Sequence, residues 1–167
     1  VAGLELLPDL LVNESGLPNF SMLRSLLEMR ASLAVDAARL ATSRANPDIV
    51  LQLQEVVERM RKRPNDVEYL QGEVQSFWDI LVRAAGNQVY VMAFNSLALC
   101  WWRYGAHLRH LLSDELRAIN QYQAIVDACR KRDPDRAAKH AAHLVQMAAE
   151  QIEKVSSGSQ QRQSVNN

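Results

Sequence analysis

The sequence has no surplus of charge of either sign. Its 167 residues include 19 Lys and Arg and 19 Asp and Glu, which gives a formal net charge of +0. Binding to phosphate backbones or to anionic lipid generally draws on a basic surplus. We therefore expect this chain by itself to bind nucleic acid poorly.

Cysteines are few and long apolar runs are absent. Cys100 and Cys129 lie far apart inside apolar helical patterns, which favours buried free thiols of a reducing compartment over a disulfide framework. No apolar run approaches the roughly 20 residues that span a bilayer, and residues 1–4 carry neither region of a secretion signal. The sequence predicts a cytoplasmic protein without a membrane segment.

The motifs of common enzyme classes are missing as well. The sequence contains no G-x-S-x-G, no Gly-rich phosphate loop and no C-x-x-C. Acidic pairs such as Glu55 and Glu58 fit a solvated helix face. We predict that the chain is not an enzyme.

What the sequence has in abundance is helical periodicity. Apolar residues recur at three- and four-residue spacing from Leu23 to Leu40 and beyond. Turn and capping residues predict breaks within residues 13–18, 46–47, 63–66, 86–87, 112–114 and 132–134, with Ser113 as an N-cap. Short connections predict one all-α domain, an antiparallel bundle of six or seven helices. Residues 156–167 have too little apolar surface to fold and are predicted to be a disordered polar tail.

Arg30 lies among apolar residues, where an unpaired guanidinium would be costly. One interpretation is that it binds a carboxylate or phosphate group of a ligand inside the bundle. The other is an ion pair with an acid of a neighbouring helix, or extension of the side chain to solvent. Both stay open, and the residues alone favour the second.

Two further groups of side chains are candidates for binding. Residues 94–104 combine bulky aromatics with Asn95 and Arg103, as the wall of a mainly apolar pocket does, although core or dimer interface is the commoner role of such residues. Four histidines form two pairs at three-residue spacing that would suit a metal only if the helices met, and no acid completes an H-E-x-x-H motif. The pairs are His107 with His110 and His140 with His143.

Three blocks of sequence occur in a fixed order: residues 27–41, which include Glu28 and Arg30; residues 77–90, which include Gly86-Asn87; and residues 125–138. In pattern and separation they resemble the ligand-binding domain of the FadR subfamily of GntR-type transcription regulators, the FCD fold. The resemblance covers most of residues 20–155 and places Arg30 on the family's arginine. It implies an effector-binding and dimerisation domain at residues 18–155 that forms a symmetric homodimer.

Many members of that family hold a divalent metal with an aspartate and three histidines. At the corresponding positions this sequence has Val74, Trp78 and Tyr122, and His143 lies about one residue out of register. The resemblance therefore implies no metal and no cofactor, and the larger apolar residues favour a fatty acyl or other lipid-like effector. We expect the effector to contact some of six residues: Arg30, Trp78, Asn95, Arg103, Tyr122 and His143.

Family members also carry an amino-terminal winged helix-turn-helix that binds operator DNA. Residues 1–17 resemble the segment after that module, so we expect the DNA-reading half to lie outside this chain. A rival hypothesis is a helical protein-interaction module whose surface includes Trp101, Trp102 and Tyr104. A third is a metal-dependent hydrolase or metal sensor built on the histidine pairs.

Overall fold

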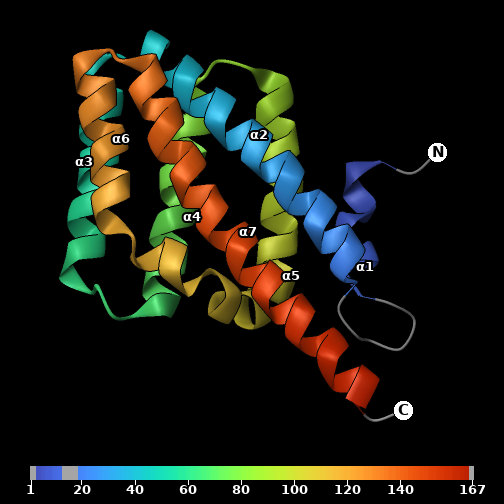
Figure 1. Ribbon diagram of the computed structural model, residues 1–167. Coiled ribbons are helices and arrows are strands. Elements are labelled where there is room, and N and C mark those ends of the chain that lie inside the picture. The colour runs from blue at the N-terminus through green and yellow to red at the C-terminus, as the bar shows by residue number, and fades with distance from the viewer. Residues whose placement is uncertain (1–2, 13–18, 166–167) are drawn as a thin grey trace.

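A computed structural model describes residues 3–12 and 19–165. These residues form a 3-10 helix, η1 (Leu4–Leu6), and seven α-helices, all shown in Figure 1: α1 (Leu7–Leu10), α2 (Phe20–Arg44), α3 (Pro47–Lys62), α4 (Val67–Ala84), α5 (Gln88–Arg117), α6 (Ile119–Lys131) and α7 (Pro134–Val165). The all-α prediction is confirmed. The predicted break within residues 13–18 lies outside the described residues.

Most helices begin where the sequence predicts a restart. Asn46 caps α3 by accepting the Ile49 backbone N–H at 2.9 Å, and Asp66 caps α4 by accepting that of Tyr69 at 3.0 Å. Pro47 and Pro134 occupy the first positions of α3 and α7, where a missing N–H costs nothing. The predicted breaks at residues 46–47, 63–66 and 132–134 therefore coincide with helix ends.

The connection between α4 and α5 needs a glycine. Gly86 has φ 63°, a left-handed conformation that glycine adopts without strain. The Arg44 guanidinium donates a hydrogen bond to the Ala85 carbonyl, so a Cβ at Gly86 would lie 3.3 Å from Nη1 of Arg44. Asn87 then caps α5 by accepting the Val89 backbone N–H at 3.0 Å.

One predicted break is wrong. α5 runs without interruption through residues 112–114 and ends at Arg117. Leu112, Glu115 and Leu116 are buried on one face, so packing continues the helix although Ser113 would suit an N-cap. The chain turns instead at Ala118, whose N–H donates to the Glu115 carbonyl at 3.1 Å and which has no side-chain cap.

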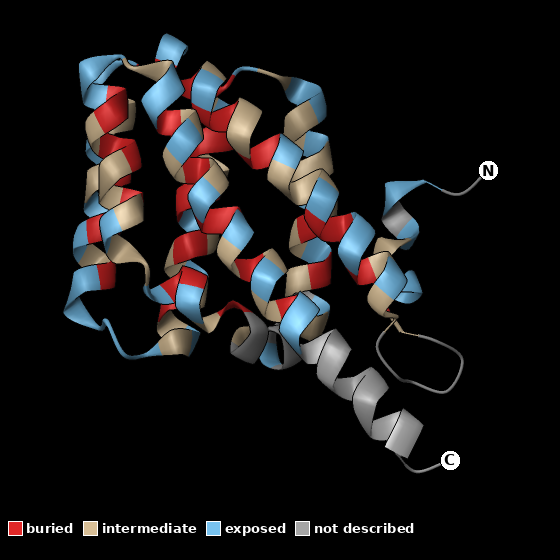
Figure 2. Cartoon of the chain, viewed as in Figure 1, coloured by how far each residue is buried: buried red, intermediate tan, exposed pale blue. Residues whose placement is uncertain are grey.

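The helices pack as a bundle in which α2 and α7 lie side by side, the blue and orange-red helices of Figure 1. Both helices bury alanines, among them Ala37 and Ala41 of α2 and Ala137 and Ala141 of α7, all fully buried. Small side chains let the two backbones approach closely. α4 packs against α2, α3 and α5, and α6 packs against α3 and α7, so one core runs through the bundle. Figure 2 shows its buried residues on the inward faces.

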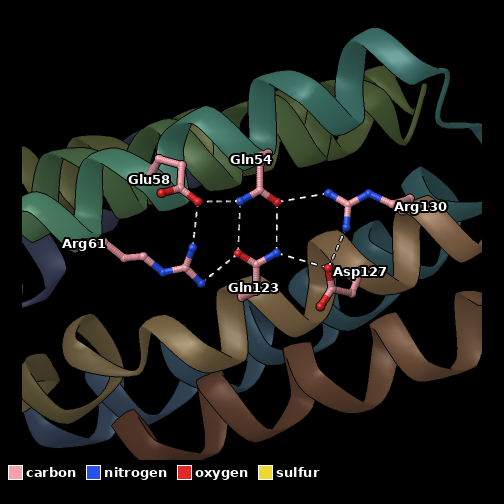
Figure 3. A network of polar contacts seen from close by, with 6 residues as sticks. All are labelled: Gln54, Glu58, Arg61, Gln123, Asp127 and Arg130. Carbon is pink, nitrogen blue, oxygen red and sulfur yellow. Dashed lines mark hydrogen bonds and ion pairs between the residues drawn. The ribbon is translucent and has the colours of Figure 1, made fainter.

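A polar network joins α3 to α6 on the outside of the bundle (Figure 3). At its centre the side-chain amides of Gln54 and Gln123 pair reciprocally, at 2.9 and 3.1 Å. Charged side chains continue the network at both ends: Glu58 and Arg61 at one, Asp127 and Arg130 at the other. Because these groups are half-buried or exposed, the network lies on the surface of the bundle and outside its core.

α7 is helical through Val165, so its backbone includes residues 156–165, for which composition predicts disorder. Once a helix is nucleated by packing, each further residue adds a hydrogen bond, so even a polar segment extends it. Burial is described only as far as Lys154. Among the described residues, no helix combines the length and apolar character that a membrane span requires.

Candidate functional site

The centre of the bundle holds a buried ion pair. Arg30 of α2 donates from Nη1 to Oε2 of Glu115 on α5 at 2.9 Å, and its Nη2 donates to Oε1 of the same carboxylate. The Glu115 side chain is 1% exposed and that of Arg30 17%. Burial acts to lower the pKa of Arg30, but the charge and hydrogen bonds of Glu115 outweigh it and raise that pKa. Of the two interpretations of Arg30, the ion pair is the one present here.

Tyr122 of α6 completes this cluster. Its hydroxyl donates to Oε1 of Glu115 at 3.5 Å, and its ring makes an edge-to-face contact with Phe77 of α4 at 5.1 Å. Burial, reinforced by the Glu115 charge, raises the pKa of Tyr122 well above its ordinary value, while Arg30 and the Trp78 indole act in the opposite direction. The phenol therefore stays neutral and serves as a donor to the carboxylate.

A cavity of about 60 Å³ adjoins this cluster between α2, α4, α5 and α7. Among the described residues of its wall, Arg30 is the one charged residue and Gln75 the one amide. The remaining lining is apolar, aromatic or thiol: Leu23, Leu26, Leu27, Leu33, Ala34, Val74, Trp78, Val82, Phe94, Leu97, Ala98, Cys100, Trp101, Leu112 and Ile152. The arrangement suits an apolar molecule with few polar atoms.

Two tryptophans of this wall carry unpaired donors. The indole N–H groups of Trp78 on α4 and Trp101 on α5 are buried and form no hydrogen bond. The Trp78 N–H lies close enough to the Tyr122 hydroxyl to lower the pKa of that phenol as a weak donor, but the two groups do not reach hydrogen-bond geometry. A buried donor without an acceptor is unusual in a folded protein and calls for a partner.

A thiol also lines the cavity. Cys100 is buried, and that burial raises its pKa to about 11. At neutral pH the group is therefore a small apolar thiol and a poor nucleophile. It contributes packing and no reactivity to the wall.

Three of the four residues at the family's metal positions, all but His143, meet at this centre. Val74 and Trp78 line the cavity, and Tyr122 contacts Glu115 beside it. None of these side chains is a usual ligand for a divalent cation, and the described residues contain no group of three His, Cys, Asp or Glu arranged to hold one. His140 bonds Gln121 through Nδ1 at 2.8 Å, and the side chains of His107 and His110 lie outside the described residues.

The other predicted contact residues do not line this cavity. Asn95 is exposed on α5, and the exposed Arg103 pairs with Asp9 of α1. His143 is exposed on α7 and borders a separate surface hollow together with Arg117. Of the six predicted residues, the structure brings together Arg30, Trp78 and Tyr122.

Sequence reasoning missed Glu115, the acid at the centre of the cluster. The signal was present, since Glu115 lies between Leu112 and Leu116 on an apolar face. The break predicted at residues 112–114 concealed it, because an acid just after a break fits the first turn of a new helix.

Comparison with known proteins agrees with this architecture. The family model described as "FCD domain" matches residues 25–147. Two mycobacterial proteins, "HTH-type transcriptional regulator Mce2R" of Mycobacterium tuberculosis and "Uncharacterized HTH-type transcriptional regulator Mb0601" of Mycobacterium bovis, are each 29% identical over 147 residues. The match covers 88% of this chain but 60% of each relative, so the chain spans well under two thirds of their length.

A solved structure described as "Streptococcus agalactiae GntR" has a similar fold. It aligns with a TM-score of 0.64 and 20% identity over 83% of this chain and 66% of that chain. At this identity the likeness concerns the fold alone. Because the family model spans most of the bundle, this chain belongs to the FCD domain family.

Proposed function

We propose that this chain is the effector-binding and dimerisation domain of a GntR-type transcription regulator of the FadR subfamily, acting in the cytoplasm and without catalysis of its own. The observation that carries the proposal is the apolar cavity beside the Arg30–Glu115 pair, with two unpaired donors on its wall. Buried donors beside a cavity are normally met by a ligand or by ordered water, and the apolar lining of this cavity favours a ligand.

The effector is a fatty acyl or other lipid-like molecule. Its apolar body would pack against the leucines and aromatic rings of the wall, and its contacts would include Arg30 and Trp78, with Tyr122 behind them against Glu115. The cavity of about 60 Å³ is smaller than the roughly 300–1,000 Å³ of common ligand sites. Entry of the effector therefore separates helices, which makes the bound packing different from the empty one.

That difference in helix packing is what can change the affinity of the regulator for DNA. The relatives named as HTH-type regulators extend beyond the matched region. In the regulator proposed here, the winged helix-turn-helix that binds DNA lies amino-terminal to this domain. The effector changes operator binding only to the extent that it binds one packing of the bundle more tightly than the other.

The dimer forms through α5. Val89 and Met92 are each 69% exposed and Leu99 is 54% exposed, and their spacing places them along one side of the helix. A symmetric contact through such an apolar stripe would set two DNA-reading domains at the spacing of a palindromic operator.

Native mass spectrometry tests both parts of the proposal. We expect a dimer that carries a small organic molecule, released when the protein is denatured. Met92→Glu should yield a folded monomer, whereas Leu51→Glu, at a position that is 62% exposed on α3, should remain dimeric. An empty monomer with no thermal shift on addition of fatty acids, their esters or acyl-CoA would overturn the proposal.

That last outcome would favour the rival function, a helical protein-interaction module. The exposed stripe of α5 would then be its binding surface. Trp101 and Tyr104, predicted as part of such a surface, are instead partly buried against the core. The side chain of Trp102 lies outside the described residues.

A further inference from the structure

We propose that the polar end of the effector is a neutral hydrogen-bond acceptor, such as an ester or ketone carbonyl, and not a free carboxylate. The inference rests on the function proposed above and specifies the chemistry of the same cavity. It follows from how charge and hydrogen-bond donors are distributed on the wall.

The positive charge at the cavity is already matched. Arg30 is the one charged residue that the described part of the lining contains, and both of its Nη atoms bond to Glu115. Glu115 in turn accepts the Tyr122 hydroxyl. A ligand carboxylate entering here would place a second negative charge in an apolar enclosure beside Glu115, without a free cation to balance it.

The groups near the cavity that lack a partner are hydrogen-bond donors, and they need an acceptor. Within the described part of the chain, the indole nitrogens of Trp78 and Trp101 are the buried side-chain polar atoms that lack a partner. An indole N–H can only donate. Among the described residues of the lining, the amide of Gln75 offers the one side-chain oxygen, and the Tyr122 hydroxyl near Trp78 does not reach hydrogen-bond geometry. Donors therefore exceed acceptors, and an uncharged carbonyl oxygen restores the balance.

The two donors come from different helices of the wall. Trp78 lies on α4 and Trp101 on α5, and these helices pack against each other. A carbonyl that accepts from both would hold the α4–α5 contact in one arrangement while its apolar chain lies against α2. This gives the neutral head group a direct influence on the packing that the effector selects.

The test compares ligands matched in size. Methyl nonanoate is an isomer of decanoic acid, whose anion is decanoate. Dodecane has the same number of non-hydrogen atoms as these two but no hydrogen-bond acceptor. Affinities are obtained at neutral pH from the ligand-dependent rise in Tm of the whole chain, with ligands delivered from cyclodextrin. We expect methyl nonanoate to bind at least about tenfold more tightly than decanoate, because the charged analogue leaves an unbalanced buried charge.

Variants assign that preference to the named groups. Trp78→Phe and Trp101→Phe keep an aromatic ring but remove the N–H, so each should weaken methyl nonanoate by about fivefold more than it weakens dodecane. Dodecane reports the effect of the smaller ring within the same variant. Glu115→Gln frees the charge of Arg30 and should reverse the order, so that decanoate binds more tightly than its ester. If that variant does not fold, the two tryptophan variants still decide the matter.

Several results would overturn the inference. One is decanoate binding wild type as tightly as methyl nonanoate; another is a loss in the tryptophan variants that is equal for ester and alkane. A charged carboxylate found as the co-purified molecule would overturn the neutral head group while leaving the sensor function intact. Absence of binding by all ligands, together with an empty native chain, would overturn the proposed function itself.

Discussion

Two clusters of polar side chains in this bundle are both held by hydrogen bonds and ion pairs, but they differ in how much they contribute to the stability of the fold. The outer network between α3 and α6 joins six side chains by numerous hydrogen bonds (Figure 3). The central cluster joins Arg30, Glu115 and Tyr122 by three. The outer groups exchange their bonds with water when separated, whereas Glu115, 1% exposed, has no water to turn to.

Burial, and not the number of bonds, therefore determines which cluster matters. An exposed pair is worth at most about 1 kcal/mol, because solvent screens it and the side chains lose freedom. Removing one partner of a buried pair leaves the other charge unmatched at a cost several times greater. Substitutions in the two regions should separate these cases.

The largest effect is expected for Glu115→Ala. It leaves Arg30 without its carboxylate inside the bundle, and we expect a loss of about 3–5 kcal/mol in the free energy of unfolding, measured with urea. The double variant Arg30→Met, Glu115→Leu removes both charges and should recover most of that loss. A double variant as unstable as the single one would show that packing around Glu115, and not charge, is what the single change damages.

A smaller effect is expected for Tyr122→Phe, with a distinctive dependence on pH. At neutral pH the variant loses a donor to Glu115 and about 1 kcal/mol of stability. The folded pKa of Tyr122 is raised by burial, so above its ordinary value of 10.0 the unfolded chain ionises first and wild type loses stability. Phenylalanine cannot ionise, so the difference between the two proteins should narrow above pH 10 in urea titrations.

Cys100 and Cys129 also have pKa values raised by burial, so their thiols ionise first in the unfolded chain. Wild type and Tyr122→Phe therefore both lose stability from about pH 9 upward. Only the difference between wild type and Tyr122→Phe isolates the phenol. A gap that stays constant from pH 8 to about pH 11 would contradict the placement of Tyr122 in the core.

The outer network should be far less sensitive. Gln123 lies at its centre and contacts Gln54, Arg61 and Asp127. Because all of these partners can turn to water, Gln123→Ala should cost no more than about 1 kcal/mol. A loss as great as that of Glu115→Ala would remove the distinction between the two clusters.

The sequence predicts the architecture well because helices are local. Apolar spacing along α2 and α4, with Asn46-Pro47 and Gly86-Asn87 at the breaks, is enough to indicate the class of fold and several helix ends. The turn at Ala118 could not be foreseen, since alanine favours helix and neither cap nor glycine marks the place. There tertiary packing overrides local preference.

The centre of the site is harder to predict. Arg30 and Glu115 are separated by 85 positions in the chain, and periodicity says only that each lies on an apolar face. Which acid meets Arg30 depends on how α2 and α5 are placed in space. The family resemblance points to Arg30, Trp78 and Tyr122, whereas the polar chemistry of Asn95 and Arg103 does not tell that these two residues are exposed.

His140 belongs to neither cluster, and its burial is intermediate between that of Glu115 and that of the exposed groups of the outer network. Its substitution should give the smallest effect. Half-buried on α7, it bonds Gln121 at 2.8 Å, and burial, followed by the charges of Arg136, Lys139 and His143, lowers its pKa. As pH falls through its ordinary value of 6.5, the unfolded chain takes up a proton before the folded one does, so the folded state loses stability. His140→Gln, which can still donate to Gln121, should make unfolding in urea less dependent on pH below 6.5. His143→Gln, exposed on the same helix, removes the smallest of the causes that lower the His140 pKa and should retain most of the dependence. Equal behaviour of the two variants would argue against a role for burial at His140.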